Sequence, residues 1–336
     1  MLNSAYINLN HLVYNAKQIK NNLPKSTLFY AVVKADAYGH GLSMCANALH
    51  PIVDGFCVAL KEEAIGLRLS GVDKEILLLI PNFKGETREL VEKDITLSVF
   101  KKEHLIQVEK CAKKLSKVAK VHVIFDSGMK RLGVETVNEL IELINFSKKL
   151  AHVKITGLFS HFAMPENDFL RQKALEKFMV AKKIIKDYNK NAIVHISASG
   201  GFLKGVYLDA VRIGLLLYGY TPFKCEKFPL KRVMKIYAPV VNTKQIKKGE
   251  SCLYGSIKSQ KDLNLKIVRY GYADGLFRKP IKGQFNNRCM DLTAVKAKGK
   301  HVCIMDNADK LARFYTTISY EILTKAAIRA EKIYIR

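Results

Sequence analysis

The sequence predicts a (β/α)8 barrel followed by a mostly β domain. Between residues 28 and 214, short β-branched apolar runs alternate with longer helical patterns, which is typical of parallel βα units. After about Pro222, Pro and Gly punctuate short β-branched stretches. The length of 336 residues also exceeds what one hydrophobic core usually supports. We therefore expect a barrel at residues 11–222 and a β domain at residues 223–336, with residues 1–10 as a candidate strand of the second domain.

Eight apolar runs are the expected barrel strands. They are Phe29–Val33, Phe56–Ala59, Ile76–Ile80, Ile95–Val99, Val121–Phe125, Ile155–Ser160, Ile193–Ser197 and Ala210–Ile213. Between them the apolar positions recur every three or four residues, as in residues 104–115, which indicates helices. A doubly wound open sheet is the alternative, but no Gly-rich dinucleotide fingerprint follows the first strand.

Composition argues against several other classes of protein. The amino terminus lacks a signal-peptide pattern, and no apolar run approaches the roughly 20 residues that span a bilayer, so we expect a cytoplasmic protein without membrane contact. The seven cysteines are scattered and form no C-x-x-C, which predicts reduced thiols and no metal site. The net charge of +26 suggests nucleic-acid binding, but no nucleic-acid-binding motif accompanies it. We expect no nucleic-acid partner; such a partner would bind with an affinity that falls steeply with salt.

Polar residues follow most of the predicted strands, at the end where barrel enzymes carry their active sites. They are Lys34, residues 126–131, His161, residues 199–201 and residues 212–214. A lysine at the end of a buried strand has a lowered pKa, which makes its neutral amine available as a nucleophile. The same lysine could instead extend to the barrel rim, and its position alone leaves both readings open. Small residues after strands seven and eight, Ser199–Gly201 and Gly214, suit a phosphate site but also suit ordinary turns.

Residues 31–41, which contain Lys34, resemble the cofactor-lysine segment of alanine racemases. Further segments similar to that family follow in the family's order and span nearly the whole chain. They are Asp126–Gly133, Gly157–Ala163, Val211–Gly214, Gly271–Gly275, Arg288–Asp291 and Thr317–Glu321. The family's fold, a barrel followed by a β domain, agrees with the prediction made from the residues.

The resemblance implies pyridoxal 5'-phosphate as the cofactor, carried by Lys34. Tyr38, Ser199, Gly214 and Tyr320 would hold its phosphate, and Arg212 would face its ring nitrogen. Because a guanidinium donates a hydrogen bond without giving up its proton, the ring would be a weaker electron sink, which favours racemisation over transamination.

Racemisation requires an acid–base group on each face of the substrate Cα. The resemblance implies that Lys34 and Tyr272 are these groups, and that Arg131 and Met290 hold the substrate carboxylate. It places His161 beside Tyr272 and near Arg212, as a further residue of the cofactor site. It also implies a head-to-tail homodimer with shared sites, because Tyr272 lies in the second domain. The expected reaction interconverts L- and D-alanine and supplies D-alanine for peptidoglycan.

Three positions depart from the family pattern. Ile124 stands where the family often has a carbamylated lysine, Ala198 where an asparagine is common, and Ile213 where a proline is usual. Ile124 deprives Arg131 of an anionic neighbour, so we expect a chloride, a carboxylate or water to replace it. Racemisation of serine or lysine, a related decarboxylase and a PLP-binding barrel without catalysis are the alternatives; the residues after Pro222, with Tyr272, argue against the last.

Overall fold

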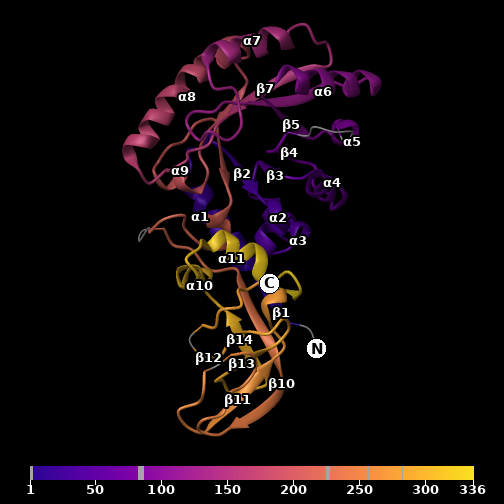
Figure 1. The fold of residues 1–336 in the computed structure, drawn as a ribbon. Coiled ribbons are helices and arrows are strands. Elements are labelled where there is room, and N and C mark those ends of the chain that lie inside the picture. Colours follow the sequence, from indigo (N-terminus) through magenta and orange to yellow (C-terminus); the bar gives the residue numbers. More distant parts are fainter. Residues whose placement is uncertain (1–2, 82–86, 225–227, 256, 282) are drawn as a thin grey trace. The chain divides into compact units, whose positions relative to one another are not determined.

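The computed structural model describes residues 3–81, 87–224, 228–255, 257–281 and 283–336. The chain divides into two compact units (Figure 1). The barrel unit comprises Val13–Ala37 and Leu42–Leu230. The C-terminal unit comprises Met1–Leu12, Tyr38–Gly41 and Lys231–Arg336.

The barrel unit contains eight parallel strands in the order β8-β7-β6-β5-β4-β3-β2-β9. They are β2 (Leu28–Val32), β3 (Gly55–Val58), β4 (Glu75–Leu78), β5 (Thr96–Val99), β6 (Ala119–Ile124), β7 (Val153–Phe159), β8 (Ile193–His195) and β9 (Ala210–Ile213). The two ends of this order meet, because Asp209 N donates to Val194 O at 3.1 Å and Arg212 N donates to Ser197 O at 2.9 Å. The predicted closed barrel is therefore confirmed, and each predicted run overlaps one strand.

Helices precede, connect and follow the strands of the barrel. They are α1 (Leu9–Asn21), α2 (Lys34–Gly39), α3 (Leu42–Leu49), α4 (Lys61–Leu69), α5 (Thr87–Glu92), α6 (Lys102–Lys114), α7 (Val137–Ser147), α8 (Asp168–Tyr188), α9 (Ser199–Leu203) and the 3-10 helix η1 (Leu215–Tyr218). The helix predicted near residues 104–115 is α6, which buries Leu105, Val108 and Ala112 at the expected spacing.

The C-terminal unit is built on a sheet of seven strands. They are β1 (Ser4–Asn8), β10 (Met234–Ile246), β11 (Leu263–Val268), β12 (Gln284–Phe285), β13 (Thr293–Val295), β14 (His301–Met305) and β15 (Glu331–Ile335). Strand β1 pairs antiparallel with β10 and parallel with β15. The unit also contains η2 (Tyr272–Asp274) and two helices that the sequence analysis did not anticipate, α10 (Ala308–Tyr315) and α11 (Ser319–Ala326).

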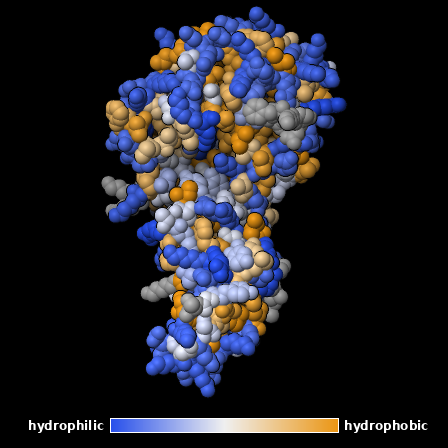
Figure 2. Space-filling view, viewed as in Figure 1, coloured by the Kyte–Doolittle hydropathy of each residue, from blue (hydrophilic) through white to orange (hydrophobic). Residues whose placement is uncertain are grey.

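Figure 2 shows one face of the molecule, on which hydrophobic residues are scattered among hydrophilic ones and form no large continuous hydrophobic patch. Six cysteines are free thiols, and Cys225 lies outside the described residues. In the described ranges, no helix is long and apolar enough to cross a membrane, and no group of three His, Cys, Asp or Glu side chains could hold a metal ion.

Candidate active site at the carboxyl ends of the barrel strands

Lys34 follows the end of β2 after one intervening residue and begins a left-handed turn, α2. The φ angles of residues 35 to 38 are 53, 54, 53 and 55°, all in the left-handed region. An L-residue in a left-handed helix costs roughly 1–2 kcal/mol, so the four together cost on the order of 4–8 kcal/mol. Backbone strain persists only where the surrounding structure enforces it, and it clusters at functional sites.

Two glycines allow the end of this turn to approach other parts of the C-terminal unit, Gly39 at helix α11 and Gly41 at Tyr334 of strand β15. Gly39 and Gly41 have φ angles of +80 and +95°. A Cβ at Gly39 would lie 2.5 Å from the carbonyl oxygen of Leu323 on α11. Tyr38 therefore belongs to the C-terminal unit, where its ring centroid lies 5.9 Å from that of Tyr320. The structure thus brings together two tyrosines that are far apart in the sequence.

The carboxylate of Glu63, near the start of α4, holds the backbone next to Lys34 by a hydrogen bond. Its Oε1 accepts a hydrogen bond from Ala35 N at 2.5 Å. Its Oε2 accepts from the N–H groups of Ala59 and Leu60 at 2.8 and 3.0 Å. One carboxylate thus ties the residue after Lys34 to the loop before α4. The sequence analysis did not identify Glu63.

Replacing Glu63 by glutamine should destabilise the protein. One carboxylate oxygen becomes an NH2 group that faces backbone donors, so at least one charge-assisted hydrogen bond is lost, at a cost of about 1.5–3 kcal/mol. The measurement is urea denaturation, with Glu62→Gln as the control, because Glu62 is an exposed neighbour in the same helical turn. Equal stability of the two variants would contradict this role of Glu63.

Four basic groups of the barrel unit interact electrostatically at the ends of the strands. Burial lowers the pKa of Lys34, and the charges of Arg131 and Arg212 lower it further, while Glu63 opposes them. Burial, followed by the charges of Arg212, Arg131 and Lys34, lowers the pKa of His161 to about 3. Lys34 is consequently closer to its neutral, nucleophilic form, and His161 is neutral at pH 7.

Arg212 is held rigidly on β9 and is only 4% exposed. Its Nη2 donates to the carbonyl oxygen of Ser160 at 2.6 Å, and its Nη1 donates to His195, through both Nδ1 and the carbonyl oxygen. The guanidinium also lies 5.1 Å from the ring centroid of Phe159, a cation–π contact. No ion pair joins Arg212 to a carboxylate in the part of the chain that the structure describes.

Ser199 and Gly214 lie at the starts of two short helices, α9 and η1. The first amides of a helix have no acceptor within that helix. Ser199 Oγ is 3.5 Å from Leu216 N, so the two helix starts lie next to each other. Ala198, at the N-cap of α9, has no side chain that could cap these amides.

Tyr272 and Met290 lie side by side in the C-terminal unit. Tyr272 N donates to Cys289 O at 3.1 Å, and Ala273 N donates to Met290 O at 3.0 Å. A Cβ at Gly271 would overlap the backbone of Met290, so glycine is required there. Both side chains are exposed, Tyr272 by 39% and Met290 by 54%.

Asp274 holds the segment that presents Tyr272. Its Oδ2 accepts from Gly271 N at 2.8 Å, and its Oδ1 accepts from Asn3 Nδ2 at 3.0 Å. A second Met–Asp pair in the sequence, Met305–Asp306, differs from the first, because Met305 is buried in β14.

Arg131 extends from a loop that Asp126 organises. Asp126 accepts from the N–H groups of Gly128 and Arg131 at 2.8 and 2.9 Å. Burial raises the pKa of Asp126, but the backbone hydrogen bonds outweigh it and the net pKa is lowered. Arg131 is exposed, and its guanidinium makes no hydrogen bond or ion pair to the described residues, so no carboxylate of those residues replaces the missing anionic neighbour. Ile124 and Arg131 line a cavity of about 30 Å³.

Comparisons with known proteins agree with this arrangement. The family model for the alanine racemase N-terminal domain matches residues 7–222, and that for the C-terminal domain matches residues 233–334. An alanine racemase of Streptococcus pyogenes serotype M6 is 32% identical over 98% of this chain and 97% of its own length. The structure of an alanine racemase from Clostridium difficile 630 is similar with a TM-score of 0.93 at 30% identity, covering 100% of this chain and 96% of that one.

A further similar structure is that of the alanine racemase of Bacillus anthracis with bound L-Ala-P. It has a TM-score of 0.88 at 27% identity and covers 99% of this chain and 94% of that one. Both units of the chain are thus matched, in order and nearly in full. The chain belongs to the alanine racemase family of isomerases.

Proposed function

We propose that this protein interconverts L- and D-alanine with pyridoxal 5'-phosphate carried by Lys34. The observation that carries the proposal is the convergence of Lys34, Arg131, His161 and Arg212 at the carboxyl ends of the strands. The printed names of the relatives, alanine racemase, support alanine as the substrate. In the cytoplasm such an enzyme would supply D-alanine for peptidoglycan.

The residues present fit this cofactor. Two guanidinium groups, Arg131 and Arg212, act on Lys34, and neither forms an ion pair with a carboxylate of the described residues, which suits the binding of an anionic group. The adjacent starts of α9 and η1, with Ser199 and Gly214, offer backbone donors for a phosphate. Tyr38 and Tyr320, whose ring centroids lie 5.9 Å apart, would also hold the phosphate. Arg212 would donate to the ring nitrogen, and when bound the cofactor would act as an electron sink for the substrate.

Two groups of the chain would move the Cα proton. Lys34 Nζ, with a pKa lowered by burial, would accept it from D-alanine and return it from that face. Tyr272 Oη would do the same for L-alanine. The neutral His161 is a candidate acceptor for the Tyr272 hydroxyl proton, and Arg131 and Met290 would hold the substrate carboxylate.

We also propose that the sites are shared in a head-to-tail homodimer. Tyr272 and Met290 are exposed on the C-terminal unit, although an acid–base group must be shielded from water to work well. An adjacent subunit would cover both side chains and receive them in its own site.

The test of the proposed reaction is deuterium incorporation at Cα. Purified protein with either enantiomer of alanine in D2O should yield both deuterated enantiomers. L-serine and L-lysine, run in parallel, test the substrate range. Exchange with serine or lysine but not with alanine would contradict the proposed substrate.

Carbon dioxide should be irrelevant to activity. Ile124 cannot form a carbamate, and the cavity of about 30 Å³ beside Arg131 can hold water, which needs roughly 10–15 Å³, or a small anion. Activity should be unchanged after exhaustive removal of carbon dioxide at mildly acidic pH, whereas chloride could support it. Loss of activity that bicarbonate restores would show that another lysine carries a carbamate.

A further inference from the structure

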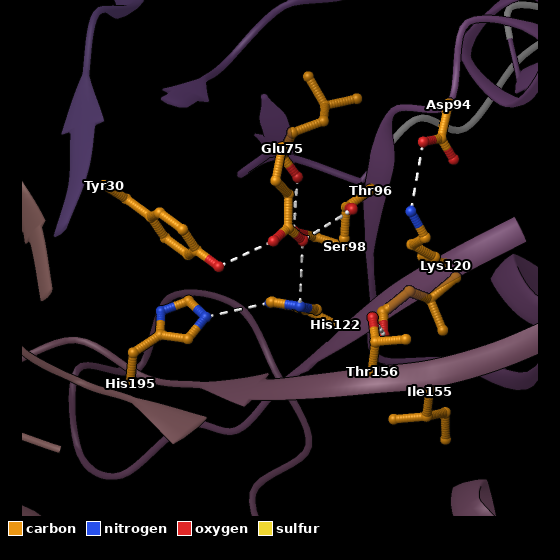
Figure 3. A network of polar contacts seen from close by, with 12 residues as sticks. Tyr30, Glu75, Asp94, Thr96, Ser98, Lys120, His122, Ile155, Thr156 and His195 are labelled. Atoms are coloured by element: carbon orange, nitrogen blue, oxygen red, sulfur yellow. Dashed lines mark hydrogen bonds and ion pairs between the residues drawn. The ribbon is translucent and has the colours of Figure 1, made fainter. Parts of the chain in front are cut away.

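The interior of the barrel unit contains polar side chains where aliphatic residues usually fill such barrels (Figure 3). Tyr30 on β2, His122 on β6 and His195 on β8 are at most 1% exposed. A buried polar group without a partner costs about 1–3 kcal/mol, so these side chains require partners inside the barrel. Tyr30, His122 and His195 lie in a row of polar contacts that runs from Arg212 to Glu75, in which all their buried polar atoms except His122 Nε2 have a hydrogen-bond partner.

The hydrogen bonds of this row can run in only one direction. A guanidinium is only a donor, so His195 Nδ1 must accept from Arg212. A neutral imidazole that accepts at one nitrogen donates from the other, so His195 Nε2–H donates to His122 Nδ1 at 3.0 Å. His122 then carries its proton on Nε2, which lies 3.8 Å from Glu75 Oε1. That last distance is too long for a hydrogen bond, and the contact is electrostatic.

Both imidazoles are neutral at pH 7. Burial lowers the pKa of His122 to about 4; Glu75 opposes this effect, and Arg212 adds to it. Burial, followed by the charges of Arg212 and His122, holds the pKa of His195 well below its usual value. The row therefore has a cation at one end, two neutral imidazoles in the middle and a carboxylate at the other end.

Glu75 is fixed at the far end of the row by two hydroxyl donors. Tyr30 Oη donates to its Oε2 at 2.8 Å, and Thr96 Oγ1 donates to its Oε1 at 3.0 Å. The Glu75 side chain is 27% exposed and lines a hollow of about 330 Å³ on the barrel unit. Arg212 has only backbone carbonyls and His195 as hydrogen-bond acceptors among the described residues. Glu75 thus places a negative charge at the end of the row opposite the guanidinium.

Two glycines leave room for the rings of this row. A Cβ at Gly157 on β7 would lie 2.5 Å from His122 Nε2. A Cβ at Gly55 on β3 would lie 2.8 Å from the ring of Tyr30. The backbone of the barrel therefore accommodates the row and its geometry.

We propose that Glu75, His122 and His195 are positioning residues that hold the Arg212 guanidinium toward the cofactor ring nitrogen. This proposal rests on the proposed function. Because the rest of the row fixes His195 Nδ1, the acceptor of Arg212, the guanidinium cannot turn away from the ring.

The direct test compares Glu75→Gln with Asp94→Asn in the holoenzyme. Both changes remove one negative charge from the same hollow, but Asp94 pairs with Lys120 at 3.2 Å, outside the row (Figure 3). Glu75→Gln should lower kcat for alanine about 10- to 100-fold, by analogy with the loss found when outer-shell partners of metal ligands are mutated. It should leave KM nearly unchanged and shift the absorbance maximum of the bound cofactor. Asp94→Asn should change none of these. Wild-type values in Glu75→Gln, or the same change in Asp94→Asn, would overturn the proposal.

A second variant displaces the row without altering charge. Gly157→Ala should push the His122 ring aside and reproduce the spectral shift. Gly66→Ala is its control, because a Cβ there meets only Leu42 Cδ2, at 3.6 Å. If the absorbance maximum of the bound cofactor is unshifted in folded Gly157→Ala protein, the proposed positioning role of the row is wrong.

The direction of the row can be tested without the cofactor. In protein labelled with ¹⁵N-histidine, His122 and His195, assigned from single His→Gln variants, should both be neutral with the proton on Nε2. A proton on Nδ1 of either ring would refute the row. A protein that binds no cofactor but shows these tautomers would instead refute the proposed function and leave the row intact.

Discussion

Lys34→Ala should abolish racemisation in both directions. The variant loses both the proposed attachment point of the cofactor and one of the two acid–base groups. Because one positioned acid–base group typically contributes about 10²–10⁴-fold, we expect kcat to fall by about 10⁴-fold or more. The variant should also retain little covalently bound cofactor. The measurement is the rate of circular dichroism change from each enantiomer of alanine, together with the absorbance of the purified protein.

The control for this variant is Lys154→Ala. Lys154 is an exposed lysine on strand β7 of the same unit and lines the hollow that contains Glu75. Lys154→Ala changes the net charge by the same amount as Lys34→Ala. Because Lys154 is outside the proposed site, racemisation should remain at the wild-type rate. Undiminished racemisation in folded Lys34→Ala protein would refute the whole account of the site.

Tyr272→Phe should separate the two faces of the substrate. The change removes only the phenolic oxygen, which we propose takes the Cα proton of L-alanine. Exchange of that proton in D2O should fall by about 10²–10⁴-fold, whereas exchange from D-alanine, which uses Lys34, should fall far less. Tyr254→Phe is the control, because Tyr254 is an exposed tyrosine of the same unit. Equal losses for both enantiomers would refute the assignment of the two faces.

The same variants test whether the sites are shared. Mixing inactive Lys34→Ala and Tyr272→Phe proteins should restore activity, since a head-to-tail heterodimer contains one site with both groups intact. No recovery after verified subunit exchange would mean that each site is built from one chain.

The barrel could be predicted because its signals are periodic and local. Each strand is a short apolar run, and the residue that follows it, such as Lys34 or His161, lies at the end of the barrel where this fold carries its active site. The Gly-Tyr-Ala-Asp-Gly segment was also informative. Its glycines permit close backbone approaches, and its Asp274 carboxylate fixes the turn that exposes Tyr272.

The left-handed turn could not be predicted, because Ala35, Ala37 and Tyr38 have no preference for positive φ angles. Neither could the row of polar residues inside the barrel. His122 and His195 each occur within an apolar run, where a single histidine is indistinguishable from an ordinary buried residue. Only the closure of the sheet brings them next to each other and next to Arg212.

Helices α10 and α11 were missed for a different reason. Asn307 caps α10 by accepting from Asp309 N at 3.0 Å, so a local signal for a helix start was present. The many Gly and Pro residues before it favoured a uniform β interpretation of the second domain. The close approach of Gly39 to Leu323 on α11 is a tertiary contact, which no local pattern in the sequence encodes.

The attachment of the cofactor tests the central claim most directly. The purified protein should be yellow, and borohydride should bleach it and eliminate racemisation of alanine. Proteolysis and mass spectrometry should then find a phosphopyridoxyl group on the peptide that contains Lys34, and on no other lysine in comparable yield. Racemisation of alanine by a protein that carries no such group, or that carries it on a lysine other than Lys34, would contradict the account.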